Sequence, residues 1–332
     1  MKVNTYSDKK RLPRMNRSKA EAKVPLRNSL RREIWKHRVV YTLLLPGLAW
    51  YIIFAYFPMG GLSLAFKDYK ANLGILRSPF TGLANYEYVF RDAAFWRALG
   101  KTVYINFGRM IFQFPAPIIL ALLINEFKSK KYKRILQTIY TFPHFFSWVI
   151  VASIVNNVFA ASGFINQLII SMGGRPVSFL GTPAIFIPML YFTDIWKYAG
   201  YGSIIYLAAI SGIDMGLYEA ADLDGASRPT KLFHITIPCI MPTIIVMFIL
   251  TSGSIMTLGF DQLFNMYNAA VKDATEVLDM YIYRITFQSA ADFSYSTAVS
   301  LIRSVLNMLL LLGANKFSIM MGGGGLMGTR EA

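Results

Sequence analysis

The chain has 332 residues, of which 55% are hydrophobic and 16% are charged, and its mean hydropathy is +0.41. Soluble domains carry roughly 25% charged residues, so this composition favours an all-α integral membrane protein and leaves little sequence for soluble domains. Cys239 is the single cysteine, which excludes an intrachain disulfide and gives no sign of a metal cluster.

The net charge of +16 is concentrated at the start of the chain. Residues 1–38 contain thirteen Lys and Arg against three Asp and Glu, and they lack the apolar core of a cleavable signal peptide. A basic tail directly before an apolar run is the positive-inside pattern, which places the N-terminus in the cytoplasm. No aromatic-studded basic fold follows, so we expect a disordered or lipid-bound tail and no nucleic-acid partner.

Six apolar runs follow the tail, each long enough for a membrane-spanning helix of about 20 residues. Pro115 and Pro117 should kink the second run, and the fourth and sixth contain charges. The runs define a transmembrane domain over 39–320, and we interpret the glycine-rich residues 321–332 as a flexible tail. Their bounds are 39–59, 99–125, 137–160, 184–210, 239–260 and 297–320.

The loops between these runs favour one orientation. Residues 126–136 carry five basic residues against one acid, whereas 161–183 carry only Arg175. The positive-inside rule therefore places 126–136, 211–238 and both termini in the cytoplasm. The loops 60–98 and 261–296 then lie outside, and their Tyr, Phe and Trp indicate either an interfacial aromatic belt or a docking surface for an external partner.

Four of the six charged residues inside the predicted spans are candidates for function, because charge is costly inside a membrane. At about 1.5 Å per residue, Asp194 and Lys197 lie near the midplane of the fourth span, and Arg109 lies at a similar depth in the second. Arg303 lies nearer the outer end of the sixth. Asp194 and Lys197 either form an i,i+3 ion pair that only stabilises the fold, or they line a translocation path.

The fourth and fifth spans also carry uncharged polar side chains. Tyr198 and Tyr201 add aromatic faces and hydroxyls to the fourth span. Thr251, Ser254 and Thr257 form a stripe in the outer half of the fifth. Such residues more often pack helices against one another than hydrogen-bond a polar substrate, and both interpretations stay open at this point.

A compact charged segment, YEAADLDGASRPTKLFHITIP, occupies residues 218–238 between these two spans. Asp214 can cap a helix over MGLYEAADLDGA, and Gly225 suits the left-handed residue that ends such a helix. Ser227 can cap a second helix with Pro229 in its first turn, where a missing N–H is tolerated. The segment is predicted to form a rigid helix–turn–helix exposed to the cytoplasm.

The spacing within this segment resembles the EAA loop of ABC importer permeases. Its positions are Glu219, Ala220 and Ala221, then Gly225 after three residues, then Ile235, Ile237 and Pro238 after nine more. The resemblance covers the chain from about Arg38 onward. It includes GLANYEYVF, FWRALGKT, FPHFFSWVIVASI and GFDQLFNMYNAAV, which are similar to permeases of carbohydrate importers, in particular the branch for complex oligosaccharides. Ile237 in place of Leu and Lys101 in place of Asn depart from that pattern.

The resemblance implies a type I ABC importer permease fold with six spans, in the cell membrane of a prokaryote. It implies a pore shared with a second, usually unlike, permease, two cytoplasmic ATPase subunits, an extracytoplasmic solute-binding protein and an oligosaccharide substrate. The residues that couple to an ATPase would be Glu219, Ala220, Ala221, Asp224, Gly225 and Pro238. The chain has no P-loop, so ATP and Mg²⁺ are expected on the ATPase, and this chain is expected to bind no cofactor and to be no enzyme.

In the resembling sugar permeases, substrate contacts cluster on the spans before and after the EAA loop. If Asp194 neutralises Lys197, Arg109 and Arg303 have no charge partner from this chain. Either a partner permease supplies acids, or the sugar is anionic and its carboxylates pair with these arginines. The residues expected along the path are Asp194, Lys197, Tyr198, Tyr201, Thr251, Ser254, Arg109 and Arg303.

Three other classes of function fit the sequence less well. An ABC importer for a peptide, an osmolyte or phosphate would share the architecture but not the matches to the sugar branch. An ion-coupled secondary transporter predicts inverted repeats, and we find none that relates 39–160 to 184–320. A membrane enzyme needs a catalytic constellation, whereas His37, His144 and His234 are scattered.

Overall fold

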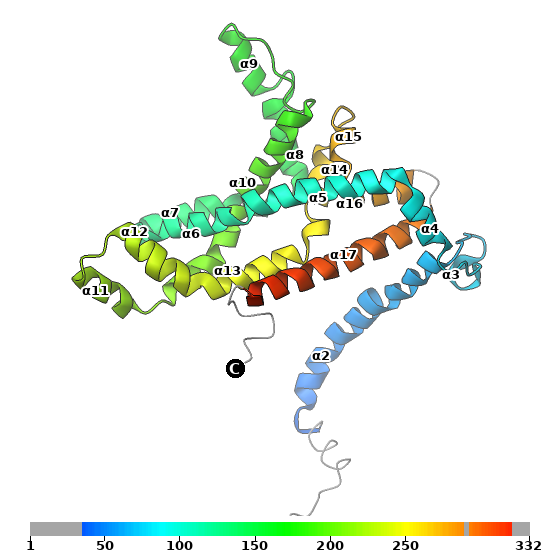
Figure 1. The fold of residues 1–332 in the computed structure, drawn as a ribbon, viewed down its shortest axis with the longest axis horizontal. Helices are drawn as coiled ribbons and strands as arrows, with labels where there is room; N and C mark the ends of the chain where they lie inside the picture. Colours follow the sequence, from blue (N-terminus) through cyan, green and yellow to red (C-terminus); the bar gives the residue numbers. More distant parts are fainter. Residues whose placement is uncertain (1–34, 289–291, 321–332) are drawn as a thin grey trace, which may run out of the picture. The chain divides into compact units, whose positions relative to one another are not determined.

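The computed structural model describes residues 35–288 and 292–320 (Figure 1). These residues form helices joined by turns, with one isolated antiparallel bridge between Lys67 and Phe80 and no strand among them. Most of the predicted basic tail, and all of the glycine-rich residues 321–332, lie outside the described residues. The chain divides into a unit that ends at Gly60 and a second unit that begins at Gly61.

The first unit contains one long apolar helix. It begins with α2 (Arg38–Tyr51), continues through the π-helical turn η1 (Ile52–Tyr56) and enters the 3₁₀ segment η2 (Phe57–Phe66). No side chain of α2 or η1 is buried, although nearly all are apolar. A helix that is hydrophobic on all sides and long enough to cross the bilayer is typical of a membrane span, in agreement with the first predicted run.

The second unit is built from long helices that pack on the central helix α10 (Pro183–Ser211). Its other helices include α5 (Ala93–Gln113), α6 (Pro115–Asn125), α7 (Lys130–Thr141), α8 (Trp148–Phe159), α9 (Phe164–Ser171), α13 (Ile237–Ser252) and α17 (Phe293–Met320). Figure 1 shows α13 and α17 side by side, and their residues are in contact. Shorter elements are α3 (Gly74–Arg77), α4 (Ala84–Arg91), α14 (Phe260–Met266), α15 (Lys272–Thr275), α16 (Leu278–Tyr283) and η6 (Arg284–Gln288).

The number of membrane-length helices agrees with the predicted six spans. Among the described residues, five helical runs are long and apolar enough to cross a bilayer. A sixth is obtained when α10 and α11 (Met215–Leu223), which bend by 69° at a short break, are taken together. Pro115, at the start of α6, marks the junction with α5 that was expected to kink.

The third and fifth predicted runs are both interrupted. Residues 137–160 do not form one helix, because the 3₁₀ turn η3 (Phe142–Phe145) separates α7 from α8, and Ser147 caps α8 by accepting from the Ile150 amide at 3.3 Å. Residues 239–260 end as a helix at Ser252. A 3₁₀ turn, η5 (Ile255–Thr257), and Gly259 in the left-handed region (φ +82°) then redirect the chain into α14.

Buried apolar side chains form three clusters in the second unit, two of which include side chains of the central helix α10. Phe186 and Leu190 of α10 pack with Trp148 of α8 and Leu263 of α14. Further along α10, Tyr206 packs with side chains of α6 and α13. A separate cluster joins the start of α5 to α16 and α17. The interruptions at η3 and η5 therefore lie beside a well-packed helix, and this packing positions the site described next.

Candidate functional site

The segment 211–238 forms the predicted helix–turn–helix. Asp214 caps α11 by accepting a hydrogen bond from the Gly216 amide at 3.0 Å, and Gly225 ends the turn with φ +71°. Ser227 accepts from the Thr230 amide at 3.4 Å and caps α12 (Arg228–Lys231), which has Pro229 in its first turn. The caps and the left-handed glycine predicted from local sequence are confirmed. We call 214–231 the knuckle.

One polar contact joins the two helices of the knuckle to each other, and a second joins the knuckle to the helix that follows it. Lys231 pairs with Asp222 at 2.5 Å, and the Tyr218 hydroxyl lies 2.8 Å from the Thr236 hydroxyl. The side facing away is open, because no residue of α11 is buried and Leu223 is 90% exposed. Most of the residues predicted to couple to an ATPase lie on exposed positions: Glu219, Ala220, Asp224, Gly225 and Pro238 are exposed, and Ala221 is partly buried.

A second feature is a cavity of about 350 Å³ in the helical body, where α5, α8 and α10 meet the interrupted segment after α13. Three predicted path residues, Arg109, Asp194 and Tyr198, line it together. The interruption of the fifth predicted span thus brings main chain to the wall of a cavity between apolar helices, the environment in which irregular backbone is tolerated inside a membrane. The remaining lining residues are Gln113, Trp148, Thr257, Leu258, Gly259, Phe260 and Asp261.

Arg109 is 1% exposed and is held by a network of buried amides. Its Nη2 donates to Gln262 Oε1 at 2.5 Å, and Gln262 Nε2 in turn donates to the Leu190 carbonyl and the Thr193 hydroxyl, both at 2.8 Å. The network connects α5, α14 and α10. Arg109 Nε has no hydrogen-bond partner among the described residues. The guanidinium is therefore fixed in place with part of its donor capacity unused.

The Arg109 guanidinium lies directly against the main chain at Gly259. A Cβ atom at this position would overlap the Arg109 guanidinium, and the φ of +82° is itself disfavoured for other residues. Only glycine combines the turn into α14 with so close an approach to the arginine.

Asp194 is 4% exposed and faces the same cavity. No residue in 35–288 or 292–320 donates a hydrogen bond to its carboxylate or forms an ion pair with it within 4.0 Å, although Arg109 and Lys197 are close enough to act on it electrostatically. A buried carboxylate needs donors. The hydroxyl groups of a ligand in the cavity would supply them.

The side chain of Lys197 has different partners from those that the sequence suggested. Its ammonium donates to the main-chain carbonyl of His144, at 2.9 Å, and to that of Phe146. These carbonyls belong to the interruption between α7 and α8, so Lys197 satisfies acceptors that the helix break releases. The i,i+3 ion pair with Asp194 considered above does not form. Tyr201 also faces this break, because its ring stacks on His144 with centroids 3.9 Å apart and planes 4° apart.

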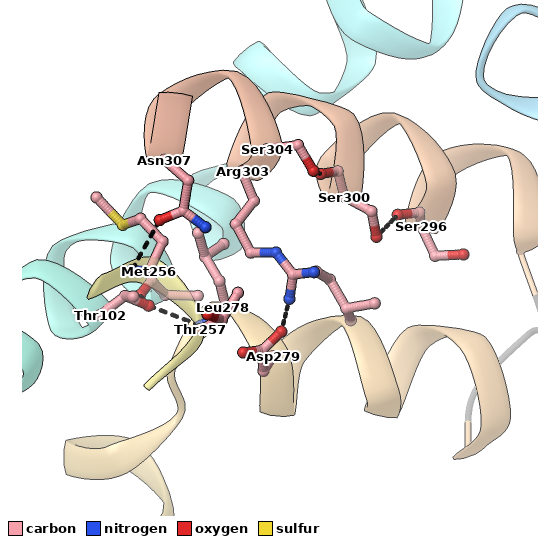
Figure 2. Close-up of polar contacts among 12 residues, drawn as sticks. Thr102, Met256, Thr257, Leu278, Asp279, Ser296, Ser300, Arg303, Ser304 and Asn307 are labelled. Carbon is pink, nitrogen blue, oxygen red and sulfur yellow. Dashed lines mark hydrogen bonds and ion pairs between the residues drawn. The ribbon is translucent and has the colours of Figure 1, made fainter. Parts of the chain in front are cut away.

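Arg303 has a charge partner within the chain, contrary to our expectation. Its guanidinium pairs with Asp279 of α16, and both side chains are largely shielded from solvent (Figure 2). One turn further along α17, Asn307 Oδ1 accepts from the Met256 amide at 3.0 Å. The expectation was wrong because Asp279 lies in an outer loop of the predicted topology, where the sequence does not indicate that it folds back onto the sixth span.

The polar stripe of the fifth span is engaged locally. Thr251, Ser254 and Thr257 donate to the carbonyls of Met247, Thr251 and Ser254, at 2.8, 3.1 and 2.8 Å. Such back-bonding satisfies acceptors where the helix unwinds. Of the three, Thr257 also lines the cavity.

Several cavity residues carried no clear signal in the sequence. Trp148, whose indole N–H donates to the Tyr198 hydroxyl at 3.1 Å, lies in the middle of the predicted third span, where the sequence does not distinguish it from the other apolar residues. Gln113 reads as an uncharged residue next to a kink. Gln262 follows a glycine after the fifth span, and only the resemblance of GFDQLFNMYNAAV drew attention to that stretch.

Comparison with known proteins identifies the architecture. The family described as "Binding-protein-dependent transport system inner membrane component" matches residues 113–317. Protein LplB of Bacillus subtilis is 43% identical over 86% of this chain and 89% of its own length. The polygalacturonan/rhamnogalacturonan transport system permease protein YteP, from the same organism, is 37% identical over 88% of this chain and 91% of its own.

A solved structure agrees with these relatives. It is a bacterial alginate ABC transporter in complex with a periplasmic protein that carries an alginate pentasaccharide. One of its chains superposes with a TM-score of 0.80 and 37% identity, over 89% of this chain and 99% of that chain. The family match over residues 113–317 covers the knuckle and every lining residue of the cavity except Arg109.

Proposed function

The chain belongs to the family of binding-protein-dependent transport system inner membrane components, and from this premise we propose that it carries acidic oligosaccharides through the membrane. It has the type I ABC permease fold and is the permease of an oligosaccharide importer. The observation that carries the proposal is its likeness, over nearly its full length, to two permeases whose names specify uronic-acid-rich polysaccharides, YteP and the alginate transporter.

The cavity offers the chemistry that a sugar acid needs. Trp148, Tyr198 and Phe260 present aromatic surfaces for the C–H faces of a sugar ring. Asp194 supplies an open acceptor for hydroxyl groups, and Arg109 supplies positive charge to the wall. Arg109 is already bonded to Gln262, so its contribution to an anionic substrate is electrostatic attraction rather than a bidentate pair.

We assign the other subunits of the transporter from the family. A second, unlike permease completes the pore, two cytoplasmic ATPase subunits bind ATP and Mg²⁺, and an extracytoplasmic solute-binding protein delivers the sugar. The knuckle inserts into an ATPase, and closure of the ATPases moves it as a rigid body. Both termini and the knuckle lie in the cytoplasm of a prokaryotic cell. Support for this assignment comes from the exposed face of α11 and from the charge of the loops.

The test is ATPase stimulation in the reconstituted complex by oligogalacturonate and by its fully methyl-esterified, neutral counterpart of equal length. The affinity of the solute-binding protein for each sugar is measured first. The ATPase assay then uses a saturating concentration of sugar-loaded binding protein, so that a difference in its affinity for the two sugars does not affect the result. We expect the acid to stimulate hydrolysis at least several-fold more than the ester. Equal stimulation by both sugars would overturn the acidic-substrate proposal.

A further inference from the structure

The described residues contain a second cavity, of about 520 Å³, between the knuckle and the loop that joins α6 to α7. Four basic side chains line it: Lys128 and Lys133 from the loop side, and Arg228 and Lys231 from the knuckle. Glu126 is the one acid in its lining. This cavity is separate from the one that holds Arg109 and Asp194, since the two share no lining residue.

Two of the four cations have hydrogen-bonding or charge partners among the described residues, and the side chains of the other two do not. Lys231 is paired with Asp222 at 2.5 Å, and Lys133 donates to Asn125 Oδ1 at 3.1 Å. The side chains of Lys128 and Arg228 form no hydrogen bond or ion pair with any residue in 35–288 or 292–320. The cavity wall therefore has an excess of positive charge whose donors are open, and an anion with several oxygens would satisfy them.

The position of the cavity along the spans limits what the anion can be. Asn125 ends α6, Ser211 ends α10, and the helix that leads into α13 continues directly from α12. The cytoplasmic ends of three spans therefore meet at this cavity. In the proposed orientation these ends lie at the depth of the lipid headgroups. Phe127 in the lining is 46% exposed, and Tyr132 on the neighbouring basic helix α7 is 63% exposed, as expected for interfacial aromatics.

We propose that this cavity binds the phosphate headgroup of an anionic phospholipid from the cytoplasmic leaflet. Basic pockets between spans on this side of a membrane suit such headgroups. The lipid would connect the knuckle to the segment 126–133, because Arg228 belongs to the knuckle and Lys128 to that segment. The proposal rests on the proposed orientation but on neither the sugar nor the ATPase.

The lining of this cavity and the exposed positions assigned to the ATPase are separate sets of residues on α11. Met215 and Tyr218 line the cavity. Glu219 and Leu223 are exposed and lie outside its lining. The span ends around the cavity place its cations at the surface of the bilayer, which favours a lipid headgroup over a segment of an ATPase.

The experiment measures retention of phosphatidylglycerol by the intact transporter complex, titrated in detergent and followed by native mass spectrometry. The test variant is Lys128→Gln with Lys133→Gln, and the matched control is Lys130→Gln with Lys131→Gln, which removes equal charge from exposed positions outside the lining. At about 1 kcal/mol for each basic residue, we expect about thirtyfold weaker binding in the test variant and little change in the control. Phosphatidylcholine of the same acyl chains should bind weakly to all three.

Other outcomes would overturn the proposal in distinguishable ways. Equal loss in the test and control variants would mean that the lipid follows net charge and not this cavity. A second outcome is that inorganic phosphate stabilises the lipid-free complex thermally, that added lipid does not diminish this effect, and that the test variant lacks it. This result would assign the site to a soluble phosphate.

A third outcome is that the pair of permeases retains phosphatidylglycerol but loses it when the ATPase is added. This result would assign the cavity to a segment of the ATPase. Accessibility of position 128 from outside the cell would instead refute the orientation.

Discussion

At the scale of single residues, three of the charges inside the predicted spans are held by partners distant in sequence, whereas Asp194 has no hydrogen-bond donor or ion-pair partner among the described residues. Arg109 is fixed by Gln262, Lys197 by the carbonyls of residues 144 and 146, and Arg303 by Asp279. The cost of buried charge could be predicted from the sequence, and so could the need for partners. Which partner each charge meets could not, since that depends on how the loops fold back onto the helices.

Gly259 offers a direct test of the cavity wall. We predict that Gly259→Ala lowers sugar uptake by the reconstituted complex about tenfold, because a Cβ would overlap the Arg109 guanidinium and the positive φ resists substitution. The matched control is Gly313→Ala on α17, where a Cβ meets no atom within 4 Å. Unchanged uptake in Gly259→Ala would show that the position of Arg109 does not matter for transport.

Asp92 ties three helices together and should make stability depend on pH. It caps α5 by accepting from the Ala94 amide at 2.7 Å, and its carboxylate accepts from the hydroxyls of Tyr281 at 2.6 Å and Tyr295 at 2.7 Å. Burial favours the protonated acid, but these hydrogen bonds outweigh it and hold the pKa of Asp92 below its usual value. A lowered pKa in the folded state stabilises the protein above the ordinary pKa of about 4, and that contribution is lost as the pH falls through the folded-state value.

We therefore predict that Asp92→Asn lowers the Tm of the purified complex at pH 7 and that the difference from the wild type shrinks toward pH 3. Scanning calorimetry or fluorescence-monitored melting across this range checks it. Tyr295→Phe, which removes one donor and keeps the carboxylate, should give a smaller decrease with the same pH trend. A Tm difference that is constant from pH 7 to pH 3 would contradict the assignment.

At the scale of elements, local signals predicted the knuckle well and the interrupted spans poorly. Asp214, Gly225 and Ser227 determine caps and a turn through atoms within a few residues, so their roles could be deduced from the sequence. The breaks at 142–147 and 253–259 lie inside apolar runs that satisfy every criterion of a span. Their stability comes from contacts such as Lys197 with the η3 carbonyls, which connect α10 to a segment about 50 residues earlier.

The knuckle prediction concerns its turn. Gly225 has φ +71° and open space around its Cα, so a substitution there acts through backbone strain and not through a clash. Gly225→Val should cost about 1–2 kcal/mol in the turn and uncouple ATP hydrolysis from uptake while the complex still inserts in the membrane. Gly225→Asn is the matched control, because asparagine tolerates the left-handed region, and it should retain most of the uptake. Full uptake by the valine variant would exclude a rigid turn as the coupling element.

At the scale of the whole molecule, composition predicted a membrane protein with six spans, and the fold agrees with this through five membrane-length helices and a bent sixth in the described residues. Orientation follows only from loop charge. We predict that, in a Cys239→Ser background, an impermeant thiol reagent added to intact cells labels a cysteine at Ser178 but not at Ser29 or Thr329. Labelling at Ser29 in intact cells would reverse the proposed topology and, with it, the side on which the knuckle lies.

The proposed function requires that the cavity beside Arg109 and Asp194 lies on the path of the sugar. Thr257 lines this cavity and is exposed, so it can carry a probe. The measurement is uptake of labelled oligogalacturonate by proteoliposomes with Thr257→Cys in the Cys239→Ser background, before and after reaction with a bulky thiol reagent. The control is Thr257→Ser with the same reagent. We predict that modification blocks uptake, that the loaded solute-binding protein with ATP slows modification, and that the serine control is unaffected. Complete modification of Thr257→Cys with undiminished uptake would contradict the claim.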